Sequence, residues 1–116
     1  MLTNKEFLIL SKSKLLLTKV NDLLENVPRK DMFYKDRLRY YILDLIDNIN
    51  HINNLYYNKE IKYFNNIMSN LMMIDFMLER LLYKKYISDK SLIKVTNILI
   101  EIKKMCNKWG NNLINE

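Results

Sequence analysis

The amino-acid sequence predicts an all-α protein that folds as one domain, an antiparallel up-down-up-down four-helix bundle over residues 1–116. The chain has one glycine and one proline, which are too few turn residues for a sheet protein. Apolar residues recur every three or four positions along four segments, and short connections separate these segments. Hydrophobic residues make up 49% of the chain, so a packed core is expected.

The first helix is predicted over about residues 4–26. Thr3 and Glu6 fit a capping box, in which each side chain accepts a hydrogen bond from the backbone amide of the other residue. Pro28 keeps Val27 away from helical backbone angles and so ends the helix. The apolar stripe consists of Phe7, Leu10, Leu17 and Leu24, widened by Leu16, Val20 and Leu23.

The second and third helices carry apolar stripes that step alternately by four and three residues, which keeps one seam facing a partner helix. Asp31 is expected to cap the second helix, which reaches roughly residue 55 before an asparagine-rich break. The third helix is expected over about residues 59–84. The stripes are Leu38, Ile42, Leu45, Ile49, Ile52 and Tyr56 in the second helix and Phe64, Ile67, Leu71, Ile74, Leu78 and Leu81 in the third.

A methionine-rich flank lies beside the stripe of the third helix. Methionine is flexible and polarizable, so such a flank can form an adaptable binding surface. More often such a flank forms ordinary core or subunit contacts, and this is the interpretation that the sequence favours. The flank consists of Met68, Met72, Met73 and Met77.

The fourth helix is predicted to begin after Ser88, which is a good cap, and Asp89 suits the first turn of a helix. Cys106 falls within the apolar series and is expected to be a small core residue rather than a reactive thiol. Gly110 lies near the expected end of the helix. The stripe consists of Leu92, Val95, Leu99, Ile102, Cys106, Trp109 and Leu113.

The chain carries a net charge of +6, which favours an acidic partner such as nucleic acid or an acidic protein surface. In the predicted bundle the first and third connections lie at the same end. Nine basic and four acidic residues fall in these regions, which leaves +5 of the chain's +6 at that end. The nine basic residues are Arg29, Lys30, Lys35, Arg37, Arg39, Arg80, Lys84, Lys85 and Lys90.

Tyrosines lie among these charges, and they suggest how a nucleic acid would be held. Cations would neutralise phosphates and release counterions, while exposed tyrosines would stack on unpaired bases at about 1–3 kcal/mol each. The alternative is that the rings are partly buried at helix ends with only their hydroxyls in water. The tyrosines are Tyr34, Tyr40, Tyr41, Tyr83 and Tyr86.

The sequence favours a non-catalytic protein without a cofactor or metal. His51 has no nucleophile and orienting acid in a recognisable pattern, and one cysteine with one histidine cannot complete a zinc site. Asp44, Asp47 and Asp75 are expected at exposed positions beside the stripes. No apolar run approaches the ~20 residues that span a bilayer, and no signal-peptide pattern is present, so we expect a cytoplasmic protein.

Four features, taken in order, resemble a known family: Val27-Pro28-Arg29-Lys30, the segment 77–82, Ile87-Ser88, and the part of the last helix from Ile98 to Trp109 with Gly110. This order over about residues 20–113 is similar to the small four-helix-bundle family of the accessory variability determinant (Avd) of diversity-generating retroelements. Proteins encoded in intervening sequences of 23S ribosomal RNA genes belong to the same family.

The resemblance implies a homopentamer of four-helix protomers with a basic surface. It implies binding of the element's reverse transcriptase and of template RNA and cDNA, in support of mutagenic cDNA synthesis. The basic positions that match are Arg29 and Lys30, with Arg80, Lys84 and Lys85 at the end of the third helix. Trp109 would then be a packing residue. The alternative is a protein-interaction module of the intervening-sequence type, with no nucleic-acid role.

Overall fold

The computed structural model describes residues 4–54 and 61–114, and within them the chain forms four α-helices, one short 3₁₀ helix and no strand. The all-α prediction is therefore confirmed, and every helix boundary falls within a few residues of the predicted one. Thr3 of the predicted capping box lies outside the described residues. The elements are α1 (Asn4–Leu24), η1 (Arg29–Asp31), α2 (Met32–Asn54), α3 (Ile61–Tyr83) and α4 (Asp89–Ile114).

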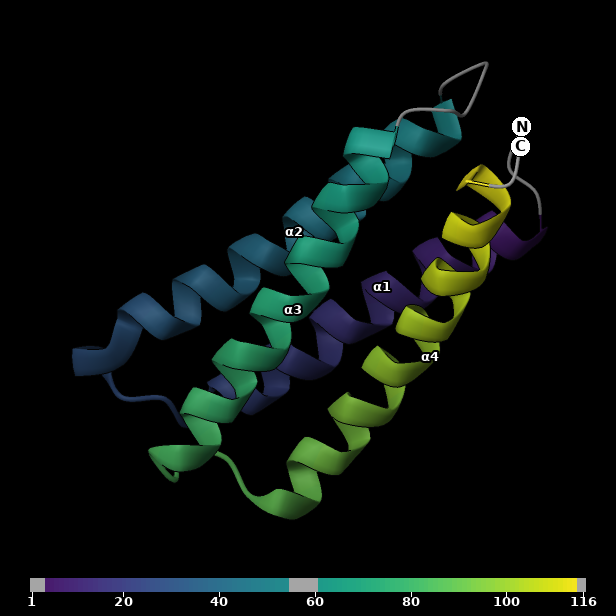
Figure 1. Ribbon diagram of the computed structural model, residues 1–116. Coiled ribbons are helices and arrows are strands. Elements are labelled where there is room, and N and C mark those ends of the chain that lie inside the picture. Colours follow the sequence, from purple (N-terminus) through teal and green to yellow (C-terminus); the bar gives the residue numbers. More distant parts are fainter. Residues whose placement is uncertain (1–3, 55–60, 115–116) are drawn as a thin grey trace.

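Each helix packs against two neighbours: α1 and α3 each contact both α2 and α4 (Figure 1). The molecule measures 45 × 23 × 22 Å. Its long dimension matches helices of 21 to 26 residues at about 1.5 Å per residue. In Figure 1 the connection between α1 and α2 and the connection between α3 and α4 lie at the same end of the molecule.

The seams predicted for α2, α3 and α4 form most of the core, because the alternating step of four and three residues keeps one face of each helix turned inward. Phe64 and Leu92, at the ends of their stripes, are half-buried. Tyr56 and the side chains of Trp109 and Leu113 lie outside the described part of the chain. The fully buried seam residues are Leu38, Ile42, Leu45, Ile49, Ile52, Ile67, Leu71, Ile74, Leu78, Leu81, Val95, Leu99, Ile102 and Cys106.

The predicted seam of α1 was partly wrong. The inward face passes through Ile9 and Ser13, whereas Leu17 and Leu23 are only half-buried. Ser13 is fully buried, and its hydroxyl donates a 2.9 Å hydrogen bond to the Ile9 carbonyl. Because this bond pairs the hydroxyl within its own helix, burial leaves no unpaired donor. The remaining inward positions are Leu10, Leu16, Val20 and Leu24, and the side chain of Phe7 lies outside the described part of the chain.

The four methionines of the α3 flank differ in how much of each side chain is exposed. Met77 is buried in the core, whereas Met72 is 71% exposed. Met68 and Met73 are half-buried. Only Met72 therefore offers a freely accessible thioether on this helix.

The ends of the helices near the two connections follow local rules. Ser88 caps α4 as predicted: its hydroxyl oxygen accepts a 3.1 Å hydrogen bond from the Ser91 amide. At the end of α3, the Tyr86 amide donates to the Leu81 carbonyl and the Lys85 amide to the Leu82 carbonyl. This is a Schellman motif, and it places Lys85 in the left-handed region with φ 64°.

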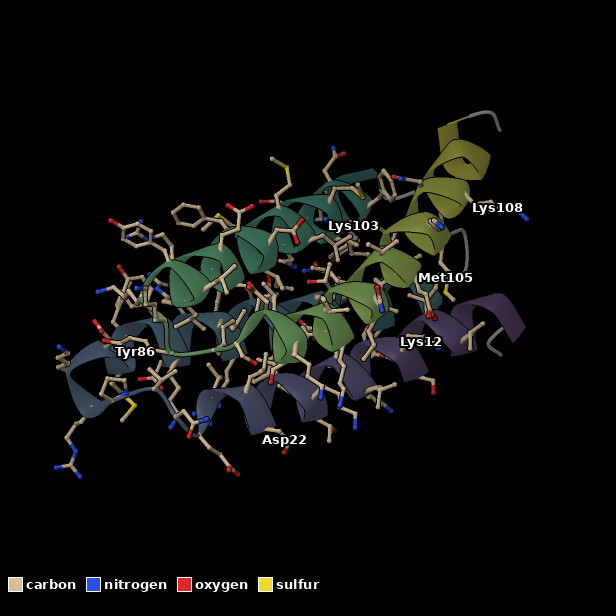
Figure 2. All side chains as sticks on the ribbon, turned by 90° about the horizontal axis from the view of Figure 1, so that it is seen from below. Lys12, Asp22, Tyr86, Lys103, Met105 and Lys108 are labelled. Carbon is tan, nitrogen blue, oxygen red and sulfur yellow. The ribbon has the colours of Figure 1, made fainter. Side chains whose placement is uncertain are left out.

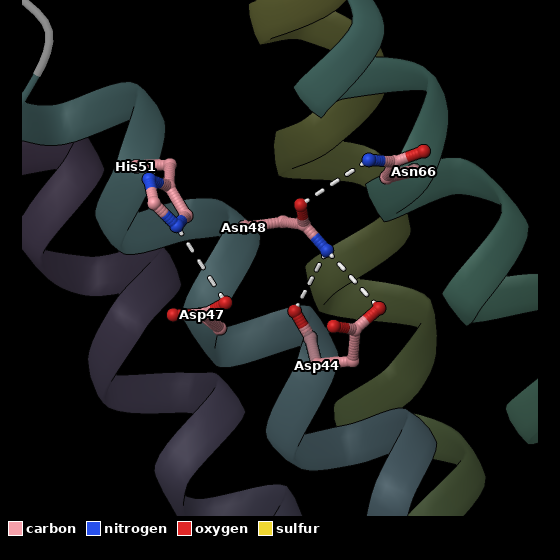
Figure 3. Close-up of polar contacts among 5 residues, drawn as sticks. All are labelled: Asp44, Asp47, Asn48, His51 and Asn66. Carbon is pink, nitrogen blue, oxygen red and sulfur yellow. Dashed lines mark hydrogen bonds and ion pairs between the residues drawn. The ribbon is translucent and has the colours of Figure 1, made fainter.

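Polar side chains interrupt the apolar interface between α2 and α3 (Figure 3). The Asn66 amide donates a 3.4 Å hydrogen bond to the Asn48 side-chain carbonyl. The Asn48 amide donates in turn to the backbone carbonyl and the carboxylate of Asp44, at 2.8 and 3.3 Å. The buried Asn70 has no such partner: its Nδ2 atom makes no hydrogen bond within the described residues.

Replacing Asn70 with leucine should stabilise the protein. A buried donor without a partner costs about 1–3 kcal/mol, and leucine has the same number and branching of side-chain heavy atoms, so the free energy of unfolding should rise by about 1 kcal/mol or more. Urea denaturation measures it. The matched control is Asn65→Leu on the exposed side of α3, which gains the same helix propensity without removing a buried amide. Equal effects of the two variants would contradict the prediction.

Replacing Ser88 with alanine should cost about 1 kcal/mol, because the Ser91 amide loses its acceptor at the start of α4. Thermal unfolding followed by circular dichroism measures the loss. Ser88→Asp restores an acceptor and should recover most of the stability. A Ser88→Asp variant as unstable as Ser88→Ala would show that the cap hydrogen bond does not matter.

Candidate nucleic-acid interface

The two connections at one end of the bundle are joined by the carboxylate of Asp31. The Tyr86 hydroxyl donates a hydrogen bond to Asp31 Oδ2, and Lys84 Nζ lies 3.5 Å from the same oxygen. The Asp31 side chain is only 14% exposed, so the contact is well shielded from water. Asp31 directly precedes α2, where it was expected to act as a cap, but these contacts reach instead to the segment between α3 and α4.

The nine predicted basic residues lie on η1, on the first turns of α2, at the end of α3 and at the start of α4. Two of them are engaged inside the protein: Arg39 Nε donates a 2.8 Å hydrogen bond to Asn21 Oδ1 on α1, and Lys84 pairs with Asp31. Lys35 and Arg80 are half-buried. The exposed members are Arg29, Lys30, Arg37, Lys85 and Lys90. We call all nine, with the rings among them, the basic end.

Three of these cations, Arg37, Arg80 and Lys84, lie over aromatic rings. The Arg37 guanidinium is 5.8 Å from the ring centres of both Phe33 and Tyr40, one turn before and one turn after it on α2. On α3, the Arg80 guanidinium lies 5.1 Å from the Tyr83 ring. Such contacts stabilise an exposed cation by about 0.5–1 kcal/mol and hold it in place. The surface therefore offers positive charge and flat apolar area side by side.

The tyrosines of the basic end divide between the two expected environments. Tyr40 is 52% exposed and Tyr83 is 74% exposed, so their ring faces are open to a base. Tyr34, Tyr41 and Tyr86 are half-buried against the core. Lys84 Nζ also lies 5.4 Å from the Tyr34 ring, which adds to the packing of the two connections.

Sequence reasoning missed two features of the basic end. Phe33 is 64% exposed and lies beside Arg37, although it was not among the candidate aromatic residues. Its spacing of four residues from Arg37 was a usable signal, because such residues are neighbours on a helix surface. The left-handed backbone of Lys85 had no signal, since glycine usually occupies that position of the motif.

The acidic residues and the histidine along α2 and α3 lie in separate contacts. Asp44 bonds to Asn48, whereas Asp75 pairs with Lys103 of α4. His51 is exposed, lies 3.6 Å from the Asp47 carboxylate (Figure 3) and stacks on the Tyr63 ring, with ring centres 4.9 Å apart. In the described part of the chain no three histidine, cysteine or acidic side chains converge as metal ligands.

Comparisons of this chain with protein-family models, with curated proteins and with solved structures give no significant match. The resemblance drawn from the sequence motifs therefore stays a prediction. Among the described helices, none is long and apolar enough to cross a membrane.

The contact between Asp31 and Tyr86 shifts the pKa of both groups. The hydrogen bond from Tyr86, aided by the nearby Lys84 ammonium, lowers the pKa of Asp31 below its ordinary 3.8. The same hydrogen bond to the carboxylate raises the pKa of Tyr86 above its ordinary 10.0. The contact is strongest when Asp31 is ionised and Tyr86 is neutral.

Replacing Tyr86 with phenylalanine should destabilise the protein most at intermediate pH. The stability that the lowered pKa of Asp31 provides is lost as pH falls below about 5 and through 3.8, and the Tyr86 contribution is lost as pH rises above 10.0. The difference in unfolding free energy between the wild type and Tyr86→Phe should shrink at both extremes. Urea denaturation between pH 3 and 11 measures it. Tyr83→Phe, at an exposed ring, should show no such window.

Proposed function

We propose that this chain is a non-catalytic accessory subunit of a diversity-generating retroelement. It binds the element's reverse transcriptase and its template RNA and cDNA through the basic end, in the cytoplasm, and supports mutagenic cDNA synthesis. The observation that carries the nucleic-acid part is Arg37 held between two exposed rings, Phe33 and Tyr40. The retroelement part rests on the motif resemblance.

The chemistry of the basic end suits a single strand better than a duplex. Each exposed cation can neutralise a phosphate and release a counterion. An open ring beside it can stack on an unpaired base, which a double helix would keep buried between its neighbours. The close contact of Asp31 with Tyr86 and Lys84 keeps both connections in one surface, so that a strand can contact both.

The proposal includes an antiparallel up-down-up-down order of the helices, and this order accounts for how the basic end forms. It is supported by the contact of Asp31 with Tyr86, which are 55 residues apart and belong to the first and third connections. It is supported as well by the packing of each helix against two neighbours. The homopentamer that the family resemblance implies would cover exposed apolar side chains on the outside of the bundle, such as Leu15 on α1 and Ile93 on α4.

One observation favours a second function, a protein-interaction module without a nucleic-acid role. Leu43 of α2 and Met72 and Phe76 of α3 are all more than half exposed, although they are large apolar side chains. Large exposed apolar side chains are typical of protein contact surfaces. On this reading the basic end binds an acidic protein, and purified protein does not bind RNA at any salt concentration.

RNA binding by the basic end should be steeply salt-dependent and should weaken when its exposed cations are removed. The variant combines Arg29→Ala, Lys30→Ala and Lys85→Asn, because asparagine tolerates the left-handed backbone at residue 85. Each lost phosphate contact should reduce the slope of log affinity against log salt by about 0.7. Fluorescence anisotropy with a short single-stranded RNA measures the slope, and light scattering on the same sample measures the oligomer mass.

The control is Lys104→Ala with Lys108→Ala, which removes two charges from exposed sites on α4, against three in the first variant. Lys108 lies far from Tyr86 along the bundle (Figure 2). These substitutions should leave the salt slope nearly unchanged. Equal losses per removed charge in both variants would mean that net charge, and not the basic end, holds the RNA. Binding that does not respond to salt would contradict the phosphate contacts.

A further inference from the structure

A small cleft lies between α1 and α4, next to the basic end but outside the residues assigned to it. Its volume is about 230 Å³. The last turns of α1 contribute Lys19 and Asp22, the segment after α1 contributes Asn26, and the first turns of α4 contribute Ser91 and Lys94. Such a volume is below the ~300–1,000 Å³ of typical sites for drug-sized ligands, and it suits one sugar phosphate.

We propose that this cleft binds one ribose phosphate unit of the RNA, an inference that rests on the proposed function. Lys19 and Lys94 face it from opposite helices and supply two ammonium groups. The Ser91 hydroxyl adds a polar group that can donate to a phosphate oxygen. These are the donors that phosphate groups prefer in proteins.

The two lysines are available for a ligand, unlike Lys12 farther along the packing of α1 against α4. Lys12 of α1 is paired with Glu101 of α4, with Nζ and Oε2 2.7 Å apart. Lys19 and Lys94 take part in no ion pair within the described residues. Figure 2 shows Lys12 and Asp22 on α1 and Met105 on α4. The charge between the two helices is therefore neutralised internally at Lys12 and left positive at Lys19 and Lys94.

Asp22 decides which phosphate-bearing ligand fits. A carboxylate beside two ammonium groups repels a bare phosphate, but it accepts a hydrogen bond from a hydroxyl on the same ligand. The ribose 2′-hydroxyl is such a donor, and it is the group by which proteins distinguish RNA from DNA. Val95 and Leu23 supply apolar atoms to the walls, against which a sugar ring can pack.

The cleft is continuous with the basic end along both of its walls. Asn26 is two residues before Pro28, after which η1 presents Arg29 and Lys30. On the other wall Ser91 directly follows the exposed Lys90. A strand bound at the basic end can therefore place its next sugar phosphate between α1 and α4.

The first experiment tests the cleft without RNA. Ribose 5-phosphate is titrated into the full chain, and amide chemical shifts are followed by NMR. Saturable shifts confined to Asn26, Ser91 and neighbouring amides are expected, and they should disappear in the variant Lys19→Gln with Lys94→Gln. Shifts of the same size with inorganic phosphate would overturn the role of Asp22, and an absence of saturable shifts would overturn the site. Neither result depends on whether the protein binds RNA.

The second experiment links the cleft to RNA. In anisotropy measurements the Lys19→Gln, Lys94→Gln variant should bind single-stranded RNA several-fold more weakly, with a salt slope smaller by about 0.7, because the one phosphate held in the cleft is lost. Asp22→Ala, which removes the acceptor, should reduce the preference for RNA over DNA of the same sequence. If the wild type binds RNA and these variants are unchanged, the cleft is not part of the interface while the proposed function stands. If the wild type does not bind RNA, the proposed function fails on its own.

Discussion

The candidate interface depends on one partly buried contact, in which the Tyr86 hydroxyl and the Lys84 ammonium hold the carboxylate of Asp31. Without it, η1 and the segment after α3 would be two separate surface loops that repel each other, because both are rich in lysine and arginine. One acidic side chain placed between them offsets that repulsion. The tyrosine adds a donor that carries no charge, so the contact holds the segments together without cancelling the positive field around them.

The backbone around this contact is shaped to allow it. Pro28 lies four residues after the end of α1 and directly precedes η1, which carries Asp31 to the beginning of α2. On the other side, the left-handed residue Lys85 turns the chain sharply after α3, so that Tyr86 points back to the bundle instead of continuing outward. Local chain geometry and long-range electrostatics thus act on the same few residues. The cations and rings of the interface are carried by rigid helix ends rather than by a loose loop.

Much of the fold was predictable from the sequence because the burial of apolar side chains is periodic. The alternation of four- and three-residue steps located the inward faces of α2, α3 and α4. On α1 the stripe was only partly right: Leu10, Leu16, Val20 and Leu24 are buried, but Ser13 also occupies an inward position and bonds within its own helix, which a pattern of hydrophobicity does not detect. The candidate site was predictable as a set of charges, and the spacing of Phe33 and Tyr40 from Arg37 on one helix was also a readable signal. The cleft beside Lys19 depends on how α1 packs against α4, which a linear pattern does not contain.

The hydrogen bond between Asn48 and Asn66 has a consequence for how α2 and α3 are aligned along their length. A seam that repeats every seven residues can be satisfied by more than one alignment, because sliding one helix by seven residues brings apolar side chains opposite apolar side chains again. Such a slide would place Met73 opposite Asn48 in place of Asn66. A thioether cannot donate a hydrogen bond to the asparagine carbonyl, so the shifted alignment would leave a buried polar group unpaired. The asparagine pair thereby selects one alignment, and that alignment brings the end of α3 to the start of α2.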